Sequence, residues 1–132
     1  MSKEEALYQS LASCGAALIA FIGVCHEFVG PTLFPWGLAF LGGPIGWNGV
    51  GLLAIVSGLV LLCGTLRLFR FPVIPFSLLA AAIGLFFFVV TAVLHRQFHM
   101  FALAGFFAGI VTAYFHRKAA QQDAPATAEL GR

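Results

Sequence analysis

The chain has 132 residues, of which 61% are hydrophobic and 9% are charged, and its formal net charge is +2. An ordinary soluble domain is roughly 45–50% apolar and about 25% charged, so this composition excludes a typical water-soluble protein. It indicates instead a single integral membrane domain whose first partner is the lipid bilayer. The few basic residues form no extended patch, which argues against a nucleic-acid partner.

The apolar runs predict an all-α integral membrane protein, a bundle of four transmembrane helices spanning about 11–29, 47–68, 76–94 and 97–115. About 20 apolar residues are needed to cross a hydrocarbon core of about 30 Å at about 1.5 Å per residue. Gly30 and Pro31 are expected to end the first helix, because proline cannot continue the hydrogen-bond ladder. Residues 1–118 form the transmembrane domain, and residues 119–132 are expected to be a mobile cytoplasmic tail.

Small residues recur along two of the predicted helices. Ala12, Ala16 and Ala20 are four residues apart, and Gly105 and Gly109 form a GxxxG pair. Such strips let two helix backbones approach closely. In a multi-helix protein, we expect them to pack the protein's own helices together.

The distribution of basic residues predicts how the bundle is oriented. An even number of spans places both termini on one side, together with most of the basic residues: Lys3, Arg67, Arg70, Arg117 and Lys118. The opposite side holds Arg96. Because basic residues are enriched in cytoplasmic loops, both termini are expected to be cytoplasmic, most simply in a bacterial inner membrane.

A long apolar loop at about 30–46 joins the first two predicted helices on the outer side. Its prolines and glycines prevent one regular helix, and whether it enters the bilayer or lies at the interface stays open. Trp36 and Trp47 suit aromatic anchoring at the membrane interface, and Asn48 suits a helix N-cap. These three residues are predicted to contact the outer surface.

The candidate site is a group of polar residues at the outer helix ends: His26, Glu27, His95, Arg96 and His99. Glu27 lies in the last turn of the first helix, where the helix dipole and burial both disfavour an anion. We therefore expect a structural Glu27–Arg96 ion pair, or a bond from Glu27 to a histidine. His26, Glu27, His95 and His99 are the candidate ligand or metal residues.

What this group would bind is open. Imidazoles and a carboxylate suit zinc or copper, and two opposed imidazoles suit haem iron, so a metal or haem cofactor is an alternative to a purely structural polar cluster. His26-Glu27 resembles the start of a zinc-protease motif, but Gly30 stands where that motif needs its second histidine. His95 and His99 are four apart, and a tight turn between them would break the helical spacing.

The sequence favours a role other than catalysis, since no nucleophilic triad is visible. The first functional hypothesis is a small accessory subunit or assembly factor that associates with other membrane subunits or with itself. The second is a metal- or haem-binding redox or carrier protein that uses the outer histidines. The third is a permease or binding protein for a small apolar molecule or lipid, which requires a cavity between the helices.

Overall fold

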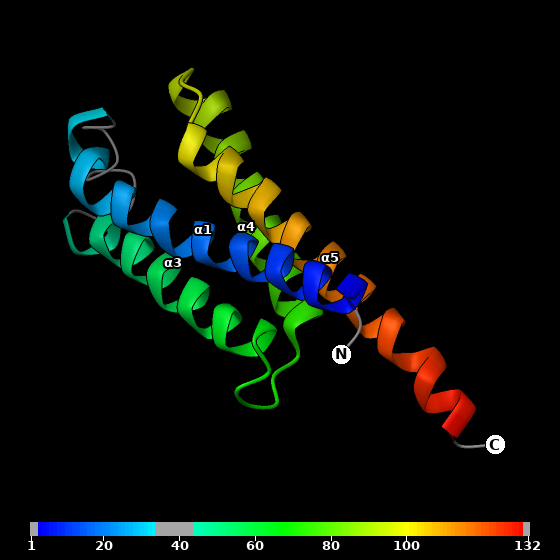
Figure 1. The fold of residues 1–132 in the computed structure, drawn as a ribbon. Coiled ribbons are helices and arrows are strands. Elements are labelled where there is room, and N and C mark those ends of the chain that lie inside the picture. Colours follow the sequence, from blue (N-terminus) through cyan, green and yellow to red (C-terminus); the bar gives the residue numbers. More distant parts are fainter. Residues whose placement is uncertain (1–2, 34–43, 131–132) are drawn as a thin grey trace.

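The computed structural model describes residues 3–33 and 44–130, with side chains described for 3–29 and 51–121. This part of the chain is all-helical, as predicted, and Figure 1 shows its arrangement. The helices are α1 (Lys3–Leu33), α3 (Pro44–Thr65), α4 (Val73–His95) and α5 (Met100–Leu130).

Three of these helices are long and apolar enough to cross a membrane by length and composition: Lys3–Val29, Val73–His95 and Met100–Gln121. The described side chains of the remaining helix, Gly51–Thr65, form a shorter apolar segment. Many large apolar side chains lie on the outside of the bundle, among them Phe86 and Val93, which are 69% and 71% exposed. An apolar exterior is what contact with lipid requires.

Several helix ends differ from the predicted spans, and α1 begins at Lys3 instead of near residue 11. The expectation that α1 ends at Gly30-Pro31 is wrong, because the helix continues to Leu33. α5 continues well past 115 to Leu130, so residues 119–130, predicted as a tail, belong to a helix that extends beyond the others (Figure 1). Alanine and glutamine in this segment have high helix propensity, which the prediction underweighted. The predicted turn between the last two helices is tight, with residues 96–99 between α4 and α5.

α1 packs against both α3 and α5, and Figure 1 shows that these neighbours run antiparallel to it. Ala20 of α1 contacts Gly58 of α3. At the end of α3, the hydroxyl oxygens of Ser13 and Thr65 lie 3.1 Å apart. Tyr8 of α1 stacks on Phe115 of α5, with ring centroids 6.0 Å apart. The small-residue face of α1 is therefore the central seam of the bundle.

α5 also packs closely against α4, where a Cβ added to Gly109 would lie 2.7 Å from the backbone oxygen of Ser77. Gly109 thus packs the protein's own helices, as expected for the GxxxG pair, whereas a Cβ added to Gly105 would meet no atom within 4 Å. α3 and α4 share far fewer contacts than the other neighbouring pairs. The helices therefore follow the spatial order α3, α1, α5, α4, and the two outer helices diverge.

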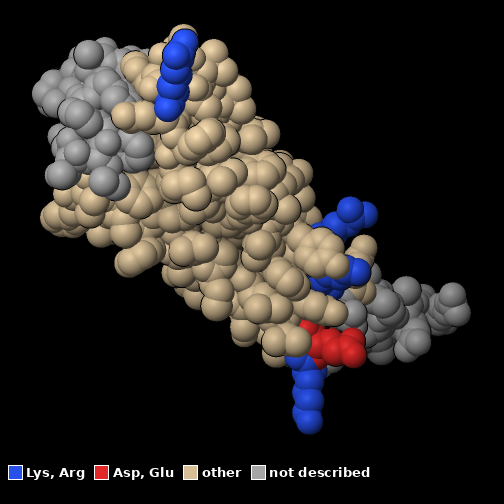
Figure 2. Space-filling view, turned by 90° about the horizontal axis from the view of Figure 1, so that it is seen from above, with Lys and Arg blue, Asp and Glu red and all other residues tan. Residues whose placement is uncertain are grey.

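The end of the bundle that holds the N-terminus is polar. Arg67, in the connection from α3 to α4, bonds through Nη1 to Oε1 of the buried Glu5 at 2.8 Å. This ion pair was not predicted, because the two residues are far apart in the sequence. Figure 2 shows basic and acidic side chains together at this end, a basic side chain at the opposite end, and an uncharged surface between.

Candidate ligand-binding cavity

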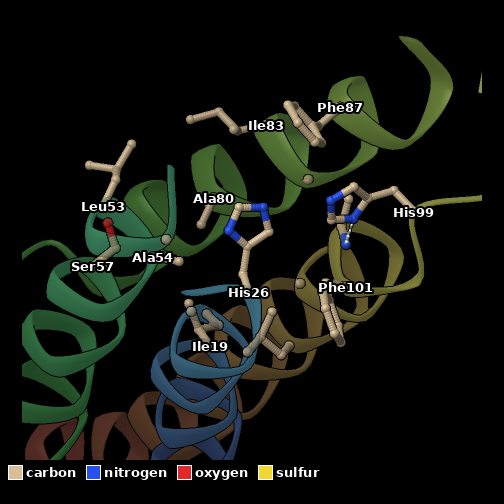
Figure 3. A pocket seen from close by; sticks show the side chains of 16 residues that line it. Ile19, His26, Leu53, Ala54, Ser57, Ala80, Ile83, Phe87, His99 and Phe101 are labelled. Atoms are coloured by element: carbon tan, nitrogen blue, oxygen red, sulfur yellow. Dashed lines mark hydrogen bonds between the residues drawn. The ribbon is translucent and has the colours of Figure 1, made fainter. Parts of the chain in front are cut away.

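The divergence of α3 and α4 leaves a cavity of about 180 Å³ that all four described helices surround (Figure 3). α1 and α3 line one side with Ile19, Ile22, Gly23, His26, Gly51, Leu53, Ala54 and Ser57. α4, α5 and the residue before α5 line the other side with Ala80, Ile83, Gly84, Phe87, His99, Phe101, Ala102 and Gly105. Ala80 to Phe87 form the middle of α4, which is one of the helices long and apolar enough to cross a membrane.

The cavity opens to the side of the bundle. Leu53 of α3 and Ile83 of α4 both line the cavity, yet their side chains are 58% and 50% exposed. These two residues therefore lie at the mouth of the cavity. Small residues make the interior, and a Cβ added to Gly105 would meet no atom within 4 Å. The space is therefore reached from the side of the bundle, between α3 and α4.

One end of the cavity is closed by two stacked imidazoles. His26 of α1 is 3% exposed and His99 is 2% exposed. Their ring centroids are 5.5 Å apart, with 25° between the ring planes. Phe87 of α4 meets the His99 ring edge-on at 5.0 Å, and Phe101 of α5 does so at 6.0 Å. These four residues, His26, His99, Phe87 and Phe101, are called the aromatic end of the cavity below.

The position of the His99 ring is fixed by the start of α5. Its Nδ1 accepts a hydrogen bond from the backbone N–H of Ala102 at 3.1 Å, so His99 caps the first turn of the helix. Because Nδ1 is the acceptor, the proton of the neutral ring is assigned to Nε2. Burial, together with the nearby His26, lowers the pKa of His99 to about 4, so the ring is neutral at pH 7.

The structure brings together His26 and His99 but not the whole predicted group. His95 is the last residue of α4 and His99 lies beyond the turn, so the four-residue spacing is not helical. Among the described side chains, no group of three or more His, Cys, Asp or Glu is placed to hold a metal ion. The residues for a zinc site of the predicted kind are thus not assembled in this part of the chain.

The predicted Glu27–Arg96 ion pair is absent from the described side chains, where the salt bridge is Arg67–Glu5. Glu27 instead packs against Gly51 of α3, and its buried Oε1 has no hydrogen-bond partner among these side chains. Arg96 is exposed and caps α4 in the left-handed conformation, with φ 52°. The turn directs Arg96 outward, and the prediction from charge balance alone did not take this conformation into account.

Replacing Arg96 by glycine is expected to stabilise the protein by on the order of 1 kcal/mol, because glycine adopts the left-handed conformation without the steric cost that arginine bears. Thermal unfolding in detergent measures the change. Arg96→Ala is the matched control, since it removes the same charge and keeps the strain. If both variants lose stability equally, the guanidinium makes a stabilising contact and the assignment of Arg96 as an exposed cap is wrong.

Trp36 lies outside the described residues, and the side chains of Trp47 and Asn48 lie outside the described ranges, although both residues belong to α3. The sequence analysis did not identify the residues that line the cavity. Its signal in the sequence is the small residues on three helices, such as Ala54, Ala80 and Gly105. Small residues also mark tight helix packing, so the signal becomes specific once the helix order is known.

Comparisons with known proteins add no relative: no family model, no curated protein and no solved structure matches the chain.

Proposed function

We propose that this protein binds a small apolar molecule or lipid taken directly from the bilayer, in the cavity between α3 and α4. The observation that carries the proposal is the lateral mouth between Leu53 and Ile83, which leads into an apolar space at hydrocarbon depth. Ligand pockets are concave, mostly apolar and equipped with a few polar groups, and here the two imidazoles supply those groups.

The orientation that goes with this proposal places both termini in the cytoplasm of a bacterium, with the protein in its inner membrane. It is supported by the grouping of most basic residues at the end of the bundle that holds the N-terminus (Figure 2). The aromatic end of the cavity then lies toward the outer side, near the turn from α4 to α5.

The proposal is tested by identifying molecules that copurify with the protein in mild detergent. Ala80 lines the cavity, whereas Ala82, two residues along the same helix, is exposed on the outside. We expect mass spectrometry to find the same bound molecule in the wild type and in Ala82→Phe. In Ala80→Phe the added ring occupies the cavity, and the bound molecule should be lost.

Three results would overturn the proposal. One is a wild-type protein that purifies with no bound small molecule and takes none up from added lipid extract. Another is loss of the molecule in both variants alike, since the effect would then come from the larger side chain and not from the cavity. The last is a molecule that both variants retain.

The role as an accessory subunit or assembly factor remains a prediction, and a partner at near-stoichiometric amount after native extraction would support it. The role as a metal or haem protein likewise remains a prediction, and it now depends on His26 and His99 as the pair that the structure brings together. Metal analysis and an absorption spectrum of the purified protein test it, because bound haem or a coloured metal would be seen directly.

A further inference from the structure

We propose that the cavity takes the head group of a quinone-like molecule: a single planar ring that carries a carbonyl oxygen, with its apolar tail leaving through the mouth between α3 and α4. This inference rests on the proposed function and names the class of ligand. Its three supports are the size of the cavity, the walls of the aromatic end and the hydrogen-bond donor of His99.

The size of the cavity suits one ring. It offers about 180 Å³, and an apolar cavity of about 150 Å³ in another protein is enough to take up benzene. A single ring therefore fits, and a flexible tail can extend past Leu53 and Ile83 into the surrounding lipid.

The walls suit a flat ring. His26, His99, Phe87 and Phe101 surround the aromatic end with ring faces and ring edges, and neighbouring centroids lie between 5.0 and 6.5 Å apart. Offset stacked and edge-to-face arrangements are the geometries that aromatic rings prefer. A planar ligand ring would continue this packing, whereas a bent acyl chain would not use it.

The donor suits a carbonyl. The hydrogen bond from Ala102 N–H occupies Nδ1 of His99 and assigns the proton to Nε2. In Figure 3 the ring nitrogen opposite that bond faces His26 and the interior of the cavity. A neutral N–H at the end of an apolar space favours a neutral acceptor such as a carbonyl oxygen. A carboxylate would be buried there without a positive partner, which is costly.

The test compares two probes with the same ten-carbon tail, decyl-1,4-benzoquinone and decylbenzene, by isothermal titration into the detergent-solubilised protein. We expect both probes to bind the wild type, with the quinone about fivefold tighter, because one buried neutral hydrogen bond contributes on the order of 1 kcal/mol. In His99→Asn, the amide oxygen can still cap α5, but the shorter side chain withdraws the donor. The preference for the quinone should then disappear, so that the two probes bind His99→Asn with equal affinity.

The infrared spectrum of the bound quinone is a second measurement that needs no variant. A hydrogen bond from Nε2–H should lower the stretching frequency of one carbonyl relative to the quinone in detergent alone. Equal affinities for the two probes, or an unshifted carbonyl band, would overturn this inference and leave the proposed function standing. Failure of both probes to bind would instead count against the proposed function itself.

Discussion

Lowering the pH from 7 to 4 is expected to destabilise the folded protein by about 3 kcal/mol through His99 alone, a value that follows from 1.36 kcal/mol per pKa unit. The pKa of His99 is about 4 in the folded protein. An unperturbed histidine, which represents the unfolded chain, has a pKa of 6.5. Between these values, the unfolded chain binds a proton that the folded chain excludes. The stabilising effect of the neutral ring is therefore complete above pH 6.5 and is lost as the pH falls toward 4.

The measurement is the thermal unfolding temperature in detergent across this pH range. Carboxyl groups also titrate near its lower end, so the informative quantity is the difference between the wild type and His99→Asn. Asparagine can keep the cap on Ala102 and does not titrate, so its curve should be flatter between pH 6.5 and 4. Parallel curves for the two proteins would show that His99 is not buried as a neutral ring.

Replacing Gly58 by alanine is expected to destabilise the bundle, whereas the same change at Gly105 is expected to be neutral or stabilising. A Cβ at position 58 would lie 2.7 Å from the Cα of Ala20, so α1 and α3 would have to separate. Overpacking of this kind costs about 1–3 kcal/mol. At Gly105 the Cβ meets open space, and alanine gains up to about 1 kcal/mol of helix propensity over glycine.

Unfolding of the two single variants, measured side by side, tests the helix order directly. Both changes add one methyl group to a glycine in an apolar helix, so differences in hydrophobicity cancel. Gly58→Leu should enlarge the loss, while Gly105→Leu should fill the cavity and keep the fold. Equal effects at the two positions would mean that α1 and α3 do not pack at Gly58.

The composition and the apolar runs were enough to predict an all-helical chain with segments long enough to cross a membrane, because these depend on local length and hydropathy. The tight turn after His95 was also predictable, since few residues separate the two apolar runs. The end of α1 was not. Gly30-Pro31 is a strong local stop signal, yet proline is tolerated inside membrane helices because other groups satisfy the freed carbonyl.

The sequence predicted that His26 and His99 lie near each other, but it did not predict the cavity or the position of Arg96. Helix topology alone brings His26 and His99 to the same end of the bundle, and the structure stacks their rings. The Glu27–Arg96 pair was inferred from charge alone, but the conformation of the turn decides where Arg96 points. The cavity depends on which helices diverge, and no local pattern encodes that property.

The most direct test of the lateral cavity is photo-crosslinking in native membranes, with a benzoylphenylalanine at position 80 and, as the control, at position 82. The account predicts that the label at 80 forms an adduct with a small bilayer molecule of defined mass, while the label at 82 reacts with bulk phospholipid. A protein adduct at position 80 would contradict the account, because the space between α3 and α4 would then hold a partner's helix. The same phospholipid adducts at both positions would also contradict it, because the space would then be ordinary lipid-facing surface.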